Sequence, residues 1–204
     1  MKEAPKFEFM LFRLLRQPGV YRKLLIGGLL SFVPVLNFFA FGYLYRTGSL
    51  CRRQAVPVLP DWDNPIGLLR DGFRFTLVWL VCWLIPVLLI LLLSCFLNWL
   101  HLGALGHCLN AAAMIGFSLF FCAALYRFQR NMDLRDLLDV MLLFRMVQGL
   151  LRHLPVAALA TFGLVSICWP LYGFAFFFGF LLLILQSFLF LHSVEASAAA
   201  SRAI

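Results

Sequence analysis

Side chains that could do chemistry are rare inside the apolar stretches of this 204-residue chain. His107 and Asn110 lie three positions apart, so they share one face of a predicted helix. Small residues follow the same stripe, namely Gly103, Gly106, Ala113 and Gly116. Small residues beside a polar partner allow membrane helices to pack closely, whereas two groups make a poor metal shell. We therefore interpret the pair as helix packing, with a ligand site as the alternative.

A second candidate is a set of three aspartates, Asp133, Asp136 and Asp139, whose spacing brings them toward one helix face. Carboxylate oxygens bind hard cations, but nothing nearby in the sequence supplies further ligands. Aspartate is also favoured at helix N-termini, either as the cap or in the first turns. We predict that Asp133 caps a helix, and that the chain holds no metal and no cofactor.

The motifs of nucleophilic, zinc-dependent and nucleotide-binding enzymes are absent from the sequence. None of the six cysteines forms a Cys-x-x-Cys pair, and five lie in apolar runs, where a thiol acts as a small apolar group. The apolar runs at 75–97, 102–125 and 154–191 contain no Asp, Glu, Lys or Arg, which disfavours ion-coupled transport through carboxylates. We expect a protein that is not an enzyme.

The composition of the chain is that of a membrane protein. Hydrophobic residues make up 63% of the sequence and charged residues 13%, whereas a soluble domain is about half apolar and about a quarter charged. The net charge of +8 could indicate nucleic acid, but the Lys and Arg residues flank apolar runs, as at a cytoplasmic membrane face. The sequence predicts an all-α polytopic transmembrane helical bundle with amphipathic interfacial helices, and no binding to nucleic acid.

Helical periodicity and run length divide a single membrane domain, residues 1–204, into segments. An amphipathic interfacial helix is predicted over residues 6–17, where one face is apolar and the other basic. A second amphipathic, cytoplasmic segment is predicted over residues 131–152. The predicted membrane spans are 75–97, 102–125, 154–169 and 172–191.

The apolar stretch 24–45 has two interpretations, because Pro34 and Asn37 lie at its centre. It could form one Pro-kinked span, or a re-entrant hairpin that returns to its own side of the membrane. Lys and Arg number six in residues 1–23, five in 46–74, five in 127–153 and one in the tail. A hairpin would place all 17 on the cytoplasmic side together with both termini, as the positive-inside rule favours. We therefore favour the hairpin and keep the kinked span as the alternative.

Two parts of the chain resemble each other weakly. The segment MLFRLLR at 10–16 aligns with LLFRMVQ at 142–148, and SFVPVLNFFAFGYLY at 31–45 aligns with SICWPLYGFAFFFGF at 166–180. The prolines of the longer segments match after a short gap. Internal repeats are common in membrane proteins, although a chain rich in Phe and Leu produces such matches by composition alone. Both explanations stay open.

A polar segment at 46–74 separates the hairpin candidate from the next span. Asp63 or Asn64 before Pro65 predicts a helix start, since a side-chain cap is followed by proline at the first helical position. Trp62 is suited to the membrane interface, where an aromatic ring with one N–H donor is favoured.

Four short patterns carry a resemblance to a known family. They are a Gly-Gly apolar start, a Pro-x-Leu-Asn-like centre, Gly-Tyr before a basic residue, and a Pro-x-Trp-Asp turn. In this chain they are Gly27 and Gly28, Pro34 to Asn37, Gly42 and Tyr43, and Pro60, Trp62 and Asp63. With them the chain resembles a domain-of-unknown-function family of prokaryotic polytopic integral membrane proteins. The resemblance implies a multi-span protein of the cytoplasmic membrane and supplies no activity, ligand or catalytic residue.

The function expected from the sequence follows mainly from these exclusions. We expect a non-enzymatic scaffold or partner subunit of a cytoplasmic (inner) membrane assembly. Its expected partners are the lipid bilayer, anionic headgroups at the cytoplasmic face, and a membrane protein or a second copy of the chain. The alternative is a transporter or channel component for a small solute or lipid, because broken hairpins and repeats occur in transport folds.

Overall fold

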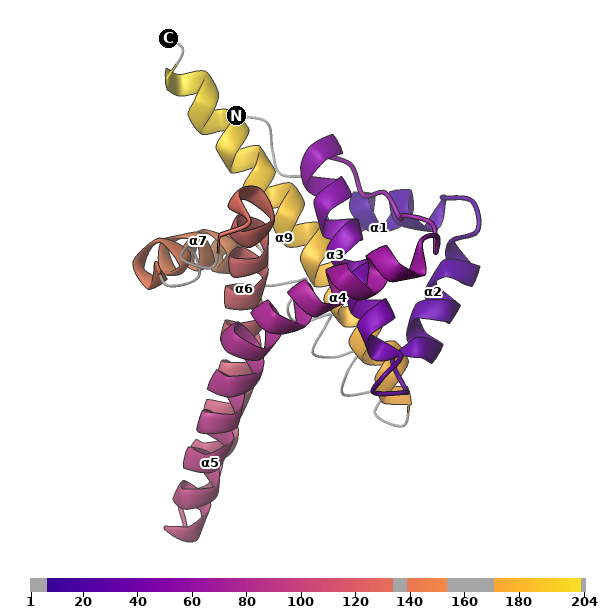
Figure 1. The fold of residues 1–204 in the computed structure, drawn as a ribbon. Coiled ribbons are helices and arrows are strands. Elements are labelled where there is room, and N and C mark those ends of the chain that lie inside the picture. Colours follow the sequence, from indigo (N-terminus) through magenta and orange to yellow (C-terminus); the bar gives the residue numbers. More distant parts are fainter. Residues whose placement is uncertain (1–6, 134–138, 154–170, 203–204) are drawn as a thin grey trace. The chain divides into compact units, whose positions relative to one another are not determined.

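The computed structural model describes residues 7–133, 139–153 and 171–202. Every regular element in these ranges is a helix, which confirms the all-α class (Figure 1). The chain divides into two compact units, Met1–Thr76 with Gly149–Ile204, and Leu77–Gln148. The two units are described separately below.

Among the described residues, three helices are long and apolar enough to cross a membrane, which indicates membrane association. They are Pro65–Trp99, Gly103–Asn131 and Tyr172–Ser197. The predicted spans 75–97 and 172–191 lie inside two of them. The predicted span 154–169 and the proline at 170 that the repeat invokes lie outside the described residues.

The first unit begins with two short helices, α1 (Phe7–Leu15) and α2 (Val20–Leu30), separated at Gly19. Gly19 has φ 69°, a left-handed conformation that glycine adopts without steric cost. One face of α1 is buried and the opposite face carries exposed aromatic rings: Met10 and Leu14 are buried, whereas Phe9 and Phe12 are exposed. The outer face of this amphipathic helix is therefore aromatic as well as basic.

Residues 24–45 form a helical hairpin rather than one continuous helix. α2 ends at Leu30, and α3 (Asn37–Gln54) begins after a turn that contains Pro34. Proline has no N–H and restricts the residue before it, so a helix ends readily at this point. The side chain of Ser31 closes the end of α2, since its hydroxyl donates to the Gly27 carbonyl at 2.9 Å.

Both arms of this hairpin pack on α9 (Tyr172–Arg202) (Figure 1). α2 is antiparallel to α9, because Gly27 lies against Phe177 and Phe32 against Tyr172, with ring centroids 5.0 Å apart. α3 is parallel to α9, because the Tyr43 ring lies 6.0 Å from that of Phe177 and the Cys51 thiol donates to the Leu185 carbonyl at 3.9 Å. The chain therefore reverses direction between α2 and α3.

The register of α3 against α9 follows the weak repeat in the sequence. Cys51 and its partner Leu185 are 134 positions apart. This separation is close to that of the aligned segments 31–45 and 166–180. The described halves of the two segments thus lie side by side and point the same way.

A π-helical turn makes room for a proline inside the longest apolar helix. α4 (Pro65–Trp79) continues through η1 (Leu80–Leu84) into α5 (Ile85–Trp99). Within an α-helix the ring of Pro86 would collide with the carbonyl four residues earlier. The Ile85 N–H instead donates to the Leu80 carbonyl, five residues back, and this wider turn accommodates the ring.

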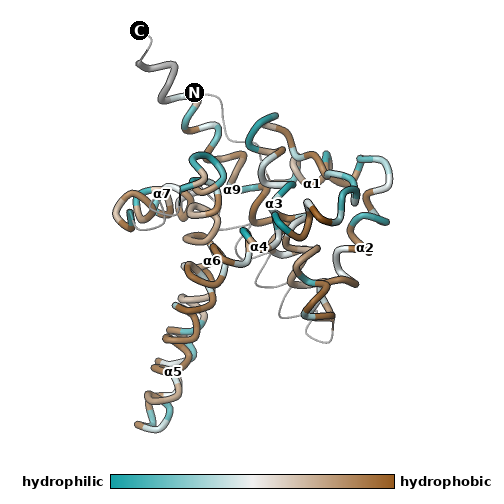
Figure 2. The backbone as a smooth tube through the Cα atoms, in the orientation of Figure 1, coloured by the Kyte–Doolittle hydropathy of each residue, from teal (hydrophilic) through white to brown (hydrophobic). Residues whose placement is uncertain are grey.

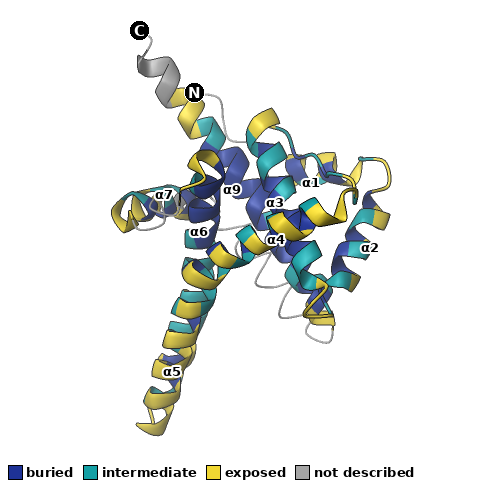
Figure 3. Ribbon diagram, viewed as in Figure 1, coloured by how far each residue is buried: buried dark blue, intermediate teal, exposed yellow. Residues whose placement is uncertain are grey.

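The second unit is built on an antiparallel pair, α5 and α6 (Gly103–Asn131). Two side-chain hydrogen bonds connect the helices, from Trp83 Nε1 to Ser118 Oγ at 2.9 Å and from Asn110 Nδ2 to Ser94 Oγ at 2.9 Å. Most exposed residues of α5 are apolar. The helix is coloured mostly hydrophobic in Figure 2 and largely exposed in Figure 3.

Several helices extend beyond the apolar runs that predict them. α3 continues to Gln54 and α6 to Asn131, where the following residues, Ala55 and Met132, adopt left-handed φ values of 54° and 57°. α4 begins at Pro65, before the predicted span. A helix continues as long as its backbone hydrogen bonds do, whereas hydropathy marks only the part suited to lipid.

The amphipathic segment predicted over 131–152 contains α7 (Val140–His153). The Leu142 N–H donates to Asp139 Oδ1 at 3.2 Å, so Asp139 rather than Asp133 caps this helix. Asp133 follows the C-terminal end of α6, and Asp136 lies outside the described residues. Asp139 therefore caps α7 itself, whereas the prediction that Asp133 caps a helix involves residues after it that lie outside the described ranges.

Candidate functional site

Aromatic stacking holds the loop that connects α3 to α4. The rings of Tyr43 and Trp62 are stacked, with centroids 4.2 Å apart and planes 13° from parallel. The Tyr43 hydroxyl donates to the Pro60 carbonyl at 3.0 Å, and Trp62 Nε1 donates to the Lys23 carbonyl at 3.2 Å. Three residues of the family-like pattern thus fasten this loop to α2 and α3.

Two side chains from before and within α2 hold the same loop farther upstream. Gln17 donates to the Pro57 carbonyl and accepts a hydrogen bond from the Leu59 N–H at 3.0 Å. The Lys23 ammonium donates to the Leu59 carbonyl at 3.1 Å and forms an ion pair with Asp61 at 2.8 Å. We call Gln17, Lys23, Tyr43 and Arg46, together with the loop 55–64 that they hold, the loop clamp.

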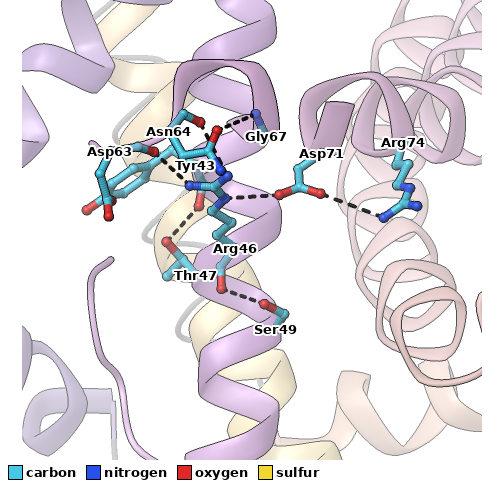
Figure 4. Close-up of polar contacts among 9 residues, drawn as sticks. All are labelled: Tyr43, Arg46, Thr47, Ser49, Asp63, Asn64, Gly67, Asp71 and Arg74. Atoms are coloured by element: carbon cyan, nitrogen blue, oxygen red, sulfur yellow. Dashed lines mark hydrogen bonds and ion pairs between the residues drawn. The ribbon is translucent and has the colours of Figure 1, made fainter. Parts of the chain in front are cut away.

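Arg46 completes the loop clamp at the start of α4 (Figure 4). Its guanidinium donates to Asp71 Oδ2 at 3.0 Å and to the Asp63 carbonyl at 2.9 Å. A planar guanidinium with several fixed donors suits such simultaneous contacts better than an ammonium. Asn64 caps α4 by accepting a hydrogen bond from the Gly67 N–H at 3.0 Å, so of the two predicted cap residues the structure selects Asn64.

Charges of α4 compensate the charge of Arg46 in the loop clamp. Asp71 lies between two guanidinium groups, 3.0 Å from that of Arg46 and 3.7 Å from that of Arg74. The side chains of Arg46 and Asp71 are each 21% exposed, so the pair is screened less than an exposed one. The arrangement stabilises the start of α4 and leaves Asp63 to contribute its carbonyl rather than its carboxylate.

Two glycines allow α3 and α4 to touch backbone to backbone. A Cβ at Gly42 would overlap the Leu68 carbonyl oxygen, and a Cβ at Gly72 would overlap the Phe38 carbonyl oxygen. Either Cβ would also lie 3.1 Å from the main-chain nitrogen of the other glycine. Small residues permit such close helix approach, and neither backbone can move aside at little cost. Gly42 of the family-like pattern therefore has a packing role, and Gly72 is its partner.

The remaining members of the pattern line the hairpin. Gly27 and Gly28 face aromatic rings of α9, where a Cβ would overlap Phe177 and Phe174 respectively. Pro34 is exposed in the turn. Asn37 begins α3, and its buried Oδ1 accepts no hydrogen bond from the described residues. The sequence pattern thus corresponds to two structural features, the hairpin on α9 and the loop clamp.

His107 and Asn110 do not form one site. Asn110 donates to Ser94 across the helix pair, whereas the His107 side chain is exposed. Gly106 also faces Ser94, since a Cβ there would lie 2.7 Å from the Ser94 hydroxyl. These contacts support the packing interpretation for Asn110. Within the described ranges no three His, Cys, Asp or Glu side chains gather as a metal site would require.

Residues that the sequence alone did not single out carry much of the loop clamp. Gln17, Lys23 and Arg46 lie in the segments that flank the apolar stretch 24–45, and their residue types alone assign them no further role. A single sequence offered no signal for their partners, because each binds main-chain carbonyls whose positions depend on the tertiary fold. Gly72 could have been noticed, because a glycine inside a predicted helix is a candidate for close helix packing.

The cysteine of α3, four residues before the loop 55–64, offers little reactivity. Cys51, on the side of α3 that faces α9, is fully buried. Burial raises the pKa of the Cys51 thiol to about 12, so it is a protonated thiol at neutral pH and a poor nucleophile. The contacts of the loop clamp are therefore hydrogen bonds and ion pairs, and the buried thiol of Cys51 adds no reactive nucleophile to them.

No curated protein and no solved structure matches the chain. A family described as "Protein of unknown function (DUF4013)" matches residues 26–186, a range that includes most of the hairpin and the loop 55–64 but not Gln17 or Lys23 of the loop clamp. Since this range is most of its length, the chain belongs to the DUF4013 family of proteins of unknown function.

Proposed function

We propose that the chain is a non-enzymatic scaffold or partner subunit of a cytoplasmic-membrane assembly, with its basic amphipathic helices on the inner leaflet. One observation carries the proposal: α1 exposes phenylalanines beside arginines. Phe9 and Phe12 are 58% and 56% exposed, and the Arg16 guanidinium lies 4.1 Å from the centroid of the Phe12 ring. Rings that insert among acyl chains beside cations that pair with headgroups are typical of helices lying at a membrane surface.

α7 supports the same proposal, because it contains residues 142–148, which the weak repeat aligns with residues 10–16 of α1. It buries Leu143 and Val147, while Phe144 is 60% exposed and precedes the exposed Arg145. The repeat aligns Phe144 and Arg145 with Phe12 and Arg13. Two helices of similar sequence thus expose the same pair of residue types, as two anchors on one lipid surface would.

The proposal includes a topology in which the hairpin of α2 and α3 re-enters the membrane from the cytoplasmic side. The reversal between these helices supports it, because a reversal returns the chain to the side where it began. Both termini and all 17 Lys and Arg residues are then cytoplasmic. Cysteines introduced as Ala4→Cys and Arg53→Cys, in a background without native cysteines, should react with an impermeant maleimide from the same side. Labelling from opposite sides would contradict the topology.

Copurification and flux measurements test the function itself. We expect purified protein to retain a stoichiometric membrane-protein partner or a second copy of itself, and to move no solute in liposomes. Solute flux that stops on substitution of Asn37 or Pro34 would contradict the scaffold and support a transporter. Phe12→Ser combined with Phe144→Ser should weaken contact with the bilayer surface, measured as depth-dependent quenching of a fluorophore on α1.

A transporter or channel component remains the second candidate because of one observation. α3 and α9 are parallel and paired in a register close to that of the sequence repeat. Internal repeats related in this way occur in transport folds, where substrate sites lie between them. Buried polar groups on the two helices include Thr47 on α3 and Ser187 on α9.

A further inference from the structure

A pocket lies next to the loop clamp, between the end of α1 and the loop after α3. Its volume is about 350 Å³, within the range of small-molecule sites. Polar and apolar side chains share its lining, among them Arg13, Gln17, Lys23, Val56, Val58 and Leu59. The pocket thus opens beside the helix that we place at the lipid surface.

Donors without partners gather around this pocket. Arg13 has no acidic partner among the described residues, and its guanidinium lies 5.6 Å from the centroid of the Phe9 ring. Lys23 has three N–H donors, of which Leu59 and Asp61 occupy two. The main-chain N–H groups of Val56 and Val58 have no hydrogen-bond partner in the part of the chain that the structure describes.

The chemistry of these groups matches a phosphate. Arginine, lysine and main-chain N–H groups are the donors that bind phosphate oxygens in proteins. The side chains of Val56, Val58 and Leu59 add an apolar wall, which a free anion does not need and a lipid does. Asp61 opposes an anion, but its side chain is 79% exposed and is therefore screened by solvent.

We infer that this pocket binds the phosphate-bearing headgroup of one anionic phospholipid, with Arg13 and Lys23 as its cations. The inference rests on the proposed function, because α1 must lie at the inner leaflet for a lipid to reach the pocket. The inference adds a specific binding site for one lipid, whereas the basic surface alone would attract anionic lipids without a defined site.

Electron spin resonance of spin-labelled lipids in vesicles tests the inference on the full chain. We expect the protein in phosphatidylcholine vesicles to restrict spin-labelled phosphatidic acid more than spin-labelled phosphatidylcholine. Arg13→Gln should lower this relative association constant about fivefold, the effect of one cation near a lipid surface. Arg13→Lys should restore most of it, and Asp61→Asn should increase it because the competing carboxylate is removed.

Arg53→Gln is the matched control, since Arg53 is an exposed arginine of the same unit outside the pocket. An equal loss in Arg53→Gln and Arg13→Gln would show diffuse attraction, which overturns the pocket and leaves the proposed function standing. Wild-type protein without preference for phosphatidic acid would overturn both. Inorganic phosphate that abolishes the preference would assign the pocket to the free anion and overturn the lipid. A preference that survives inorganic phosphate supports the lipid.

Discussion

α9 and α5 are both long, apolar helices, but they are surrounded differently. In an apolar 18-residue window of each candidate span, 78% of the window in Tyr172–Ser197 and 17% of the window in Pro65–Trp99, the helix that contains α5, is buried. α9 packs against α2, α3 and α1. α5 packs mainly against α6 and leaves Leu88, Leu89 and Leu92 exposed.

This difference shows that similar hydropathy can meet two different physical requirements. The side chains of α9 must fit protein neighbours, as the glycines of α2 fit the Phe174 and Phe177 rings, so their shapes matter. The outward side chains of α5 face lipid in the proposed topology, and any apolar residue suits them equally. The comparison predicts where substitutions will be costly.

Truncation of a leucine should separate the two helices most clearly. Leu181 on α9 is fully buried, so Leu181→Ala should lower the free energy of unfolding by about 4 kcal/mol through lost contacts and a cavity. Leu92 on α5 is 68% exposed, and Leu92→Ala should change the free energy of unfolding by less than about 0.5 kcal/mol. Denaturant titration in bicelles measures both, and equal losses would contradict the distinction.

A methyl group at the crossing of α3 and α4 should have the next largest effect. Gly42→Ala should lower the free energy of unfolding by about 3 kcal/mol, because the new Cβ meets a main-chain carbonyl rather than a side chain. Gly116→Ala in α6 is the control, since a Cβ there meets nothing within 4 Å. That variant should be more stable by about 0.5 kcal/mol, through helix propensity alone. A neutral Gly42→Ala would show that the helices do not touch as closely as described.

The polar contacts of the first unit should contribute less than its packing. Arg46→Gln removes the charge-assisted hydrogen bonds to Asp71 and to the loop, which should lower the free energy of unfolding by about 2 kcal/mol. Arg46→Lys should recover only part of this loss, because an ammonium lacks the planar fork. Proteolysis within 55–64 should become faster in both variants. An unchanged rate would show that Arg46 does not hold this loop in place.

Several of these features were predictable from the sequence because they depend on local chemistry. Hydropathy located the long apolar helices, Pro34 the break between α2 and α3, and Asn64 before Pro65 the start of α4. The π-helical turn before Pro86 and the continuation of α3 to Gln54 were not predicted. Both follow from backbone hydrogen bonding, which a hydropathy profile does not contain.

The candidate site was predicted only in part, and its long-range contacts explain why. The family-like pattern identified Gly42, Tyr43 and Trp62 without their roles. Those roles depend on partners far away in sequence, such as Lys23 for Trp62 across 39 positions. A single sequence indicates such a pair only where the two residue types are complementary, such as an acid and a base. Every residue has a main-chain carbonyl, so a side chain that binds a carbonyl cannot be matched to its partner in this way.

The polar contacts within the second unit should show the smallest effect. Asn110→Ala removes the hydrogen bond to Ser94 and should lower the free energy of unfolding by about 0.6 kcal/mol, the average for such bonds between membrane helices. Ser94→Ala should cost the same amount, and the double variant no more than either single one, because both remove one bond. A loss several times larger would mean that this hydrogen bond, rather than close packing at Gly106, sets the stability of the α5–α6 pair. α5 and α9 would then differ because a polar contact stabilises α5 and apolar packing stabilises α9. The difference between lipid and protein surroundings would not be the main cause.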